Sequence, residues 1–351
     1  MAQTGYSPTN TAYVNAIFGT LHRNIQPRVT VQNLRKSKPL LKWLLSNCAK
    51  PESDSPIIKN VQFNRFASAN QFTDYSGTFV TGVNDVPLMT AQWYIAAHVN
   101  PITSNIFELS KFLGAGKVNQ IIDVVSERLT DNYETFLEVM NNAILGTSNN
   151  VPALLYQQPA NNAILPDGLQ DAIDNGTLKP TYGGITRSTY PAWNAFVYTN
   201  SQSSVPAWQQ LYFYLMSFIN DQNGTLPDIM VCGPDVYYAV ATSMTSIERV
   251  IIQTGNTVAS DRSWEVQTID IAGVPLVVDK NMPAATVYFL KAKNLELAYN
   301  PDFFMELIPA ESLISTGQLG YVQVMIATYE LLTTLPSGLA MLKSAPAVTL
   351  A

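Results

Sequence analysis

The chain has 351 residues and a formal net charge of −6 at pH 7; 47 % of its residues are hydrophobic and only 13 % are charged. This composition is typical of a globular protein with a substantial core, and a surface so poor in charge is weakly protected against association with other proteins. The N-terminus has no secretory-signal pattern, no apolar run approaches the ~20 residues of a membrane span, and Cys48 and Cys232 lie too far apart for a metal-ligand spacing, which favours reduced thiols in a cytosolic protein.

Residues 1–50 combine positive charge with one apolar segment. They contain no acidic residue and seven basic ones: Arg23, Arg28, Arg35, Lys36, Lys38, Lys42 and Lys50. The other 301 residues hold 13 basic and 26 acidic groups, so a basic arm precedes an acidic body. We interpret the arm either as a solvated tail or as a segment that docks on an acidic partner. Its segment "PLLKWLLSN" is dense in leucine around Trp43, which favours a groove in a protein over a nucleic acid.

Residues 60–99 are expected to be extended. In "PLMTAQWYIAAHV", Met89, Ala91, Trp93, Ile95 and Ala97 alternate with the residues between them, which is the period of a strand. The turn signal "VNDVP" separates this stretch from the aromatic-rich stretch before it. The pattern predicts a long two-stranded hairpin, which is marginal alone in water and needs a surface to lie on.

Residues 117–145 carry the strongest helical period of the chain. The apolar positions recur three and four residues apart and form one stripe: Ile122, Val125, Leu129, Tyr133, Phe136, Met140 and Ile144. Such a helix would be roughly 40 Å long, with Gly146 just past its end. We expect it to be a spine on which other elements lie.

The segment "GGITRSTYPAWNA", residues 183–195, has the features of a loop that holds a ligand or another protein. Gly183 and Gly184 allow a positive φ or a close approach of the backbone, and Arg187 offers a planar fork for carboxylates or phosphates. Trp193 is a large amphipathic side chain of the kind enriched at interfaces. The alternative is a tight turn followed by a tryptophan of the core.

Residues 206–310 are expected to form a compact α/β insertion, followed by a long C-terminal strand. A helix is predicted from the spacing of Trp208, Leu211, Tyr212, Leu215 and Phe218. A buried strand in "PDIMVCGP", a helix in "DVYYAVATSM" and strands with turns at Gly273 and near Lys293 follow. In the tail, Val322, Val324 and Ile326 alternate with Tyr321, Gln323 and Met325.

Catalytic patterns are not found in the sequence. His22 and His98 do not form a metal-binding pair, and each is expected at the surface. The phosphate-loop pattern fails around "GAGK", because Lys111 replaces the first glycine and Val118 replaces the hydroxyl residue. No nucleophile elbow or dinucleotide fingerprint is present. We therefore expect no catalytic, cofactor-binding or metal-ligating residue.

Four segments carry a resemblance to a known family: "DGLQDAI" (167–173), "NGTLKPTYGGITRSTYPAWNA", "LPDIMVCGPDVYYAV" and "IAGVPLVVDKNMP". With the order of the predicted elements, they resemble the major capsid proteins of tailed double-stranded DNA bacteriophages, over essentially the whole chain. The resemblance implies an α+β chain with the Hong Kong 97-like fold. Its parts would be an N-arm (1–50), an E-loop hairpin (51–100), a P-domain (101–205 and 311–351) and an inserted A-domain (206–310).

The resemblance also implies a function and partners. Hexamers and pentamers of the chain would enclose the genome in an icosahedral head, in a virion assembled in the cytoplasm of a bacterial host. A portal, a decoration protein and double-stranded DNA on the inner face are implied partners, and the short N-terminal segment suggests a separate scaffolding protein. Packaged DNA, an acidic scaffold and the acidic body of a neighbouring subunit are three destinations for the basic arm. The candidate subunit-contact residues are Trp43, Trp93, Gly183, Gly184, Arg187 and Trp193.

Two other functions stay open on the sequence. Encapsulins, cellular compartments of the same fold, share the layout. A soluble α/β hydrolase would need a site in the loops of residues 167–195. One departure from some capsid relatives is that residues 60–110 contain no lysine, so the amine of an E-loop cross-link is missing.

Overall fold

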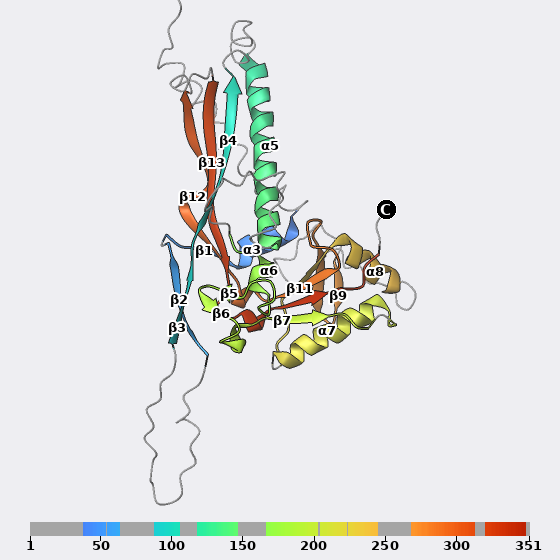
Figure 1. The fold of residues 1–351 in the computed structure, drawn as a ribbon. Helices are drawn as coiled ribbons and strands as arrows, with labels where there is room; N and C mark the ends of the chain where they lie inside the picture. Colours follow the sequence, from blue (N-terminus) through green and yellow to red (C-terminus); the bar gives the residue numbers. More distant parts are fainter. Residues whose placement is uncertain are drawn as a thin grey trace, which may run out of the picture.

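A computed structural model of the chain describes residues 38–53, 55–63, 88–105, 118–146, 166–202, 204–222, 224–244, 268–312 and 320–348. Residues 1–37, which hold most of the predicted basic arm, and residues 64–87, which hold the tip of the predicted hairpin, lie outside this part. Two main sheets contribute side chains to one shared core, and a long helix runs beside the first sheet (Figure 1).

The long sheet has four strands in the order β1, β12, β13, β4. Their bounds are Ala49–Pro51 (β1), Glu296–Ser312 (β12), Gly320–Leu332 (β13) and Ala96–Asn105 (β4). Strand β1 is parallel to β12, and the other pairs are antiparallel. Strand β13 confirms the long strand expected near the end of the chain. On this strand Met325 and Ala327 are buried, whereas Val324 and Ile326 are half-buried.

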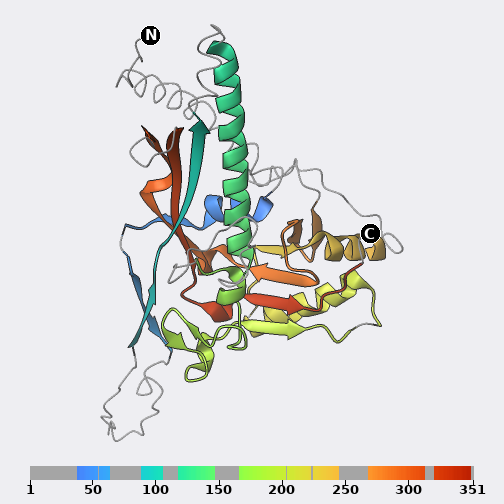
Figure 2. The same ribbon diagram turned by 45° about the horizontal axis from the view of Figure 1, so that its top comes forward.

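Helix α5, Val118–Leu145, is the expected spine, and it lies along one face of the long sheet (Figures 1 and 2). The ring of His98 on β4 stacks on Phe136 with 4.3 Å between centroids, which joins the helix to the sheet. The members of the predicted stripe whose side chains are described are all buried: Tyr133, Phe136, Met140 and Ile144. Leu137 and Val139 are buried as well, so this end of the helix is covered on more than one side.

The second sheet has six strands in the order β7, β14, β11, β8, β10, β9. Their bounds are Phe196–Thr199 (β7), Ile229–Cys232 (β8), Ile269–Ile271 (β9), Val274–Val278 (β10), Thr286–Leu290 (β11) and Ala340–Lys343 (β14). Side chains of β8 and β11 alternate between two clusters. Met230 and Phe289 join the residues of two helices, while Val231 and Tyr288 join the core shared with the long sheet.

The two helices on this second sheet are α7, Ala207–Asp221, and α8, Pro234–Met244. Both confirm helices expected from the sequence. The ring of Phe218 stacks on that of Phe289 at 5.9 Å, which seats α7 on the sheet. One position differs from the prediction, because Tyr212 is exposed and Tyr214 is buried in its place. None of the described helices is long and apolar enough to cross a membrane.

Strands that share a sheet come from more than one of the expected domains. Strand β12 pairs with β13 in the long sheet, although its residues were expected in the inserted domain. Strands β7 and β14 belong to the second sheet, although both were expected in the P-domain. Strand β4 begins at Ala96, inside the range expected for the hairpin. The reason is physical: strand propensity does not specify which sheet a strand joins.

The expected hairpin is present at its root. Strand β2, Ile57–Gln62, pairs antiparallel with β3, Leu88–Trp93, and the pair projects away from the rest of the subunit (Figure 1). The sequence predicted one alternating strand through residues 89–98, but this stretch contains two strands, β3 and the start of β4. Trp93 and Ala96 are both buried, so the buried face changes between them, where the chain passes from the hairpin to the long sheet.

Helix α3, Pro39–Asn47, contains the apolar segment of the expected arm. Leu40, Leu41 and Leu44 are fully buried in the shared core of this same subunit. The buried carboxylate of Asp279 accepts the backbone N–H of Leu40, which holds the start of the helix, and also the side-chain amide of Asn141 on α5 at 3.2 Å. Residues 39–47 are therefore an anchor within the subunit.

Candidate functional site

Residues 166–195 form a compact platform beside the root of the hairpin. The platform contains α6 (Leu169–Ala172), β5 (Thr181–Tyr182), β6 (Ile185–Thr186) and a short 3-10 turn (Pro191–Trp193). Strands β5 and β6 pair around Gly183 and Gly184, whose φ angles are +57° and +76°. A two-residue hairpin turn with positive φ at both positions strongly favours glycine, so this pair of glycines follows from local geometry.

Gly183 lies directly under the hairpin. A Cβ atom at this position would stand 2.8 Å from Cζ2 of Trp93 and 3.3 Å from Cβ of Ala91, both on β3. Its carbonyl oxygen accepts the backbone N–H of Gln92 at 2.9 Å. The close approach and the hydrogen bond seat β3 on the β5–β6 turn.

Aromatic rings surround this contact. The ring of Trp93 meets that of Tyr182 edge-on, with 5.8 Å between centroids, and lies 6.5 Å from that of Trp193. Phe63, just past β2, stacks on Tyr190 at 4.9 Å and meets Trp193 edge-on at 5.7 Å. We call Tyr182, Gly183, Tyr190 and Trp193 the hairpin socket. Both strands of the hairpin are thus held at their root by the same four residues.

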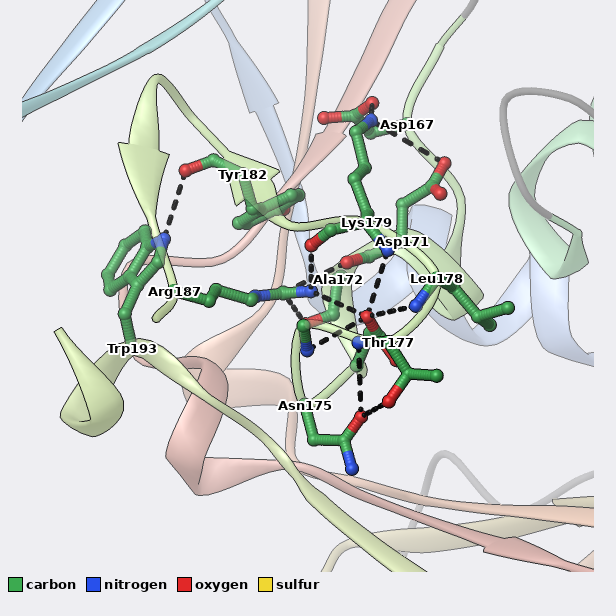
Figure 3. A network of polar contacts seen from close by, with 12 residues as sticks. Asp167, Asp171, Ala172, Asn175, Thr177, Leu178, Lys179, Tyr182, Arg187 and Trp193 are labelled. Atoms are coloured by element: carbon green, nitrogen blue, oxygen red, sulfur yellow. Dashed lines mark hydrogen bonds and ion pairs between the residues drawn. The ribbon is translucent and has the colours of Figure 1, made fainter. Parts of the chain in front are cut away.

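Arg187 holds the platform together from inside (Figure 3). Its guanidinium is fully buried and donates from Nη2 to the carbonyl oxygens of Asp171 and Ala172, each at 2.9 Å. Its Nη1 donates to the carbonyl oxygen of Lys179 at 3.2 Å and to Oδ2 of Asp174 at 3.4 Å. The group also lies 5.1 Å from the ring centroid of Tyr182. Burial lowers the pKa of Arg187 and the nearby carboxylates oppose that shift, so the side chain is a charged centre of the platform.

Asp174 shapes the loop around that centre. Its Oδ2 accepts the backbone N–H groups of Gly176 at 3.0 Å, Leu178 at 2.9 Å and Lys179 at 3.0 Å. The indole N–H of Trp193 donates to the carbonyl oxygen of Tyr182 at 3.0 Å, which fixes the ring in the socket. The Trp193 ring is therefore held in the socket by a hydrogen bond within the platform itself.

Two hydrogen bonds tie the platform to the long sheet. The backbone N–H of Asp167 donates to Oε1 of Glu330 at 2.9 Å, and the backbone N–H of Thr333 donates to the hydroxyl of Tyr182 at 3.1 Å. Lys179 forms ion pairs with Asp167 and, at 3.7 Å, with Asp171. Burial raises the pKa of Glu330 well above its ordinary value, and the neighbouring Asp167 adds to that effect.

A second attachment lies on the other strand of the hairpin. Nζ of Lys59 on β2 lies 3.1 Å from Oε1 of Glu52 and 3.2 Å from Oε1 of Glu296 on β12. Lys50 pairs with the other oxygen of Glu296 at 2.8 Å. The direction of the hairpin is thus set by an aromatic socket on one side and by charged contacts with the long sheet on the other.

The structure places most of the predicted contact residues inside the subunit. Trp43, Trp93, Arg187 and Trp193 are between 0 and 7 % exposed. These four side chains pack within their own subunit, and their contact with another subunit stays a prediction. Gly183 is covered by the hairpin, whereas Gly184 is exposed, and no atom of the described residues lies within 4 Å of the point where its Cβ would stand.

Several residues of the site were missed from the sequence. Glu330, Asp174 and Lys59 have ordinary local sequence surroundings, and only the folded chain brings them to the platform or the hairpin. Tyr182 stands in the quoted segment before Gly183, but no periodic signal marked it as part of an aromatic cluster. The neighbour that explains Gly183 is Trp93, which is distant in sequence.

The described residues offer little reactive chemistry. They contain no group of three or more His, Cys, Asp or Glu side chains that could hold a metal ion. Burial lowers the pKa of His98 to about 4, and its ring is stacked on Phe136 and half-buried, which corrects the expected surface position. Burial raises the pKa of Cys48 to about 12 and raises that of Cys232 as well, so both thiols stay protonated and weakly nucleophilic at neutral pH.

Comparison with known proteins identifies the fold. No family model matches the chain, and no curated protein matches its sequence. A subunit of the cyanophage A-1(L) capsid superposes with a TM-score of 0.59 at 12 % identity, covering 85 % of this chain and 90 % of that one. The holo-SrpI encapsulin of Synechococcus elongatus PCC 7942 superposes with a TM-score of 0.53 at 13 % identity, covering 88 % and 89 %. The chain has the Hong Kong 97-like fold, an α+β architecture.

Proposed function

We propose that this chain, which has the Hong Kong 97-like fold, is the major capsid protein of a tailed double-stranded DNA bacteriophage. Copies of it would assemble as hexamers and pentamers into an icosahedral head. The observation that carries the proposal is the superposition on the cyanophage capsid subunit, because it spans 85 % of this chain and 90 % of the other. A match over so much of both chains relates most of the architecture to that of a shell subunit.

The hairpin supports this proposal through its construction. Isolated two-stranded hairpins are marginal in water, yet this one is anchored at its root by the hairpin socket and by Lys59. Ile58 and Leu88 on the projecting strands are 56 % and 67 % exposed. Ile57, Ala91 and Trp93 on the opposite face are buried. A hairpin that is fixed on one face and carries exposed apolar side chains on the other is suited to lie on a neighbouring subunit.

The hydrolase alternative loses its proposed site. The loops of residues 167–195 are filled by their own side chains, with Arg187 and Trp193 at the centre. In the platform, Nη1 and Nη2 of Arg187 and Oδ2 of Asp174 bond to backbone groups of the same segment. We therefore infer a structural role for this segment.

The encapsulin alternative has one observation in its favour, the superposition with a TM-score of 0.53 over 88 % of this chain. The encapsulin and capsid functions differ in the proteins needed to close the shell and in the contents of the shell. A capsid protein of the proposed type would depend on a separate scaffolding protein and a portal. It would also meet packaged DNA, without sequence preference, on its inner face and offer its outer face to a decoration protein. We place it in the virion, after assembly in the cytoplasm of the bacterial host.

The test is electron microscopy of the purified chain in negative stain, alone and with candidate scaffolding proteins, together with size-exclusion chromatography. Capsomers, tubes or shells are expected, and closed shells of one size should require the second protein. Uniform closed shells from the chain alone would favour the encapsulin function. A discrete small oligomer under every assembly condition would contradict both shell functions.

A further inference from the structure

A cluster of buried and half-buried charges lies where the platform meets the long sheet, and its signs do not balance. It contains four carboxylates and two cations: Asp167, Asp171, Asp174, Glu330, Lys179 and Arg187. Arg187 pairs with Asp174 at 3.4 Å, and Lys179 pairs with Asp167 and Asp171. Among the described residues, Glu330 forms no ion pair, it is 2 % exposed, and its Oε2 has no hydrogen-bond partner.

Glu330 occupies a joint between two parts of the subunit. It belongs to β13 of the long sheet, and its Oε1 accepts the N–H of Asp167, where the described platform begins. A second hydrogen bond joins the platform to the end of β13 in the described residues. The backbone N–H of Thr333 donates to the hydroxyl of Tyr182. Tyr182 is also a member of the hairpin socket. The bond between Glu330 and Asp167 therefore lies on the route from the long sheet to the root of the hairpin.

The charged groups that act on Glu330 all come from the platform. Asp167, Asp171 and Lys179 face it from the first half of the platform, and Tyr182 and Arg187 lie behind them on β5 and β6. Burial is the largest cause that raises the pKa of Glu330, and Asp167 is the next. Burial also raises the pKa of Asp167. An ionised Glu330 would add an unpaired negative charge to a dry site that already holds two acids nearby, which is costly.

We propose that Glu330 and the amide of Asp167 form a proton-responsive joint, closed when Glu330 is protonated and loosened when it ionises. In the closed joint, Glu330 is neutral and accepts the N–H of Asp167, and the platform stays fixed to β13. When the carboxyl group loses its proton, the N–H of Asp167 and the cation of Lys179 still favour the closed joint. The cost of burying the charge and the repulsion from Asp167 and Asp171 outweigh them, which favours separation of the platform from the strand. Because the platform carries the hairpin socket, the joint controls how firmly the hairpin is held.

The direction of the pH dependence follows from linkage. The pKa of Glu330 in the folded subunit is raised above its ordinary value of 4.5. The stabilisation of the closed joint is therefore fully present below that ordinary value and is lost as the pH rises toward the pKa in the fold. In this window the opening constant of the joint rises by up to about tenfold per pH unit, because one proton is released on opening.

The test is amide hydrogen exchange of the full chain, unassembled, over a series of pH values, followed by mass spectrometry. Exchange in residues 166–182, corrected for its intrinsic pH dependence, should speed up by up to about tenfold per pH unit above about pH 5. Residues 130–145 of α5 serve as the internal control. The Glu330→Gln variant keeps the hydrogen bond and cannot ionise. In this variant the rise of exchange with pH in residues 166–182 should be smaller than in the parent chain. An unchanged pH dependence in this variant would overturn the proposal.

A second variant covers the case in which Glu330→Gln does not fold. Lys179→Met removes a cation that favours the ionised form of Glu330 and so raises its pKa in the closed joint further. The rise in exchange should begin at the same pH and continue to higher pH than in the parent chain. A rise that levels off at the same or lower pH would refute the joint. The measurement uses single subunits, so failure of the joint and failure of the proposed capsid function are separate outcomes.

Discussion

Gly183 packs so closely against Trp93 that a side chain has no room there. A Cβ atom on Gly183 would stand 2.8 Å from Cζ2 of the indole. The same glycine has a φ of +57°. Two independent constraints therefore act on one residue, one from the turn between β5 and β6 and one from the hairpin that lies on it. The neighbouring Gly184 has only the first constraint, since nothing in the described part of the chain lies within 4 Å of its Cβ position.

This difference predicts unequal effects for two alanine substitutions. Gly184→Ala should cost roughly 1–2 kcal/mol of unfolding free energy, from the left-handed backbone alone. Gly183→Ala should cost about 1–3 kcal/mol more, because the indole must move. Urea unfolding followed by tryptophan fluorescence measures both. In a Trp93→Ala background the difference should disappear; if it persists, the contact is not its cause.

A second prediction concerns Arg187. Arg187→Met leaves the carboxylate of Asp174 buried without its cation, which should cost about 3–5 kcal/mol. The matched control is Lys280→Met, which breaks the exposed pair with Glu138 at 3.5 Å and should cost less than about 1 kcal/mol. Chemical denaturation of the purified subunits compares them. Equal losses in the two variants would show that the buried network does not hold the platform.

A third prediction concerns the spine. Phe136 is fully buried between α5 and the long sheet, so Phe136→Ala should cost about 3–5 kcal/mol through the cavity it leaves. Asp131→Ala, at an exposed position of the same helix, should stay within about 0.5 kcal/mol of the parent chain. Thermal unfolding provides the comparison. A Phe136→Ala subunit of unchanged stability would mean that the face of the helix is assigned wrongly.

A fourth prediction separates the described root of the hairpin from residues 64–87. Replacing residues 64–87 by a short Gly/Ser linker keeps Phe63, β3 and the socket contacts. The subunit should fold with nearly unchanged stability and should no longer form closed shells. Trp93→Ala, which removes a socket contact, should instead lower the stability of the subunit by about 3–5 kcal/mol. Loss of folding in the linker variant would assign the exchanged residues to the subunit core.

A fifth prediction follows from the absence of lysine in residues 60–110. A cross-link through a lysine amine in this range cannot form, and the hairpin lysine just before it, Lys59, is paired with Glu52 and Glu296. Boiled and reduced particles should run on a denaturing gel as a single band near the chain mass of 38.6 kDa. A ladder of covalent multimers would contradict the prediction.

Local patterns in the sequence predicted most of the elements. The spacing of Tyr133, Phe136 and Met140 identified the spine to within one residue of its observed start and end, because one face of a long helix repeats every few residues regardless of what covers it. The hairpin strands, α7 and α8 were found by the same reasoning. The fold class followed from the order of these elements and from the resemblance of four segments to capsid proteins.

The hairpin socket could not be predicted in the same way. The segment of residues 183–195 was interpreted as a loop that holds a ligand, another protein or a core tryptophan, and the structure shows that it holds the hairpin of its own subunit through Trp93 and Phe63. Glu330 and Lys59 reach this region from distant strands. Contacts between residues so far apart leave no trace in the local pattern.

The sequence by itself determined which segments are helices and strands, where the glycines permit a turn, and which positions are too apolar to face water. The tertiary structure decided which sheet each strand joins and which face of β13 is buried, since Val324 and Met325 are both apolar and alternation alone cannot choose between them. It also decided that Trp43, Trp93, Arg187 and Trp193 stabilise their own subunit. The physical reason is common to all three: periodicity depends on neighbours along the chain, whereas burial and pairing depend on surfaces that exist only once distant segments have packed together.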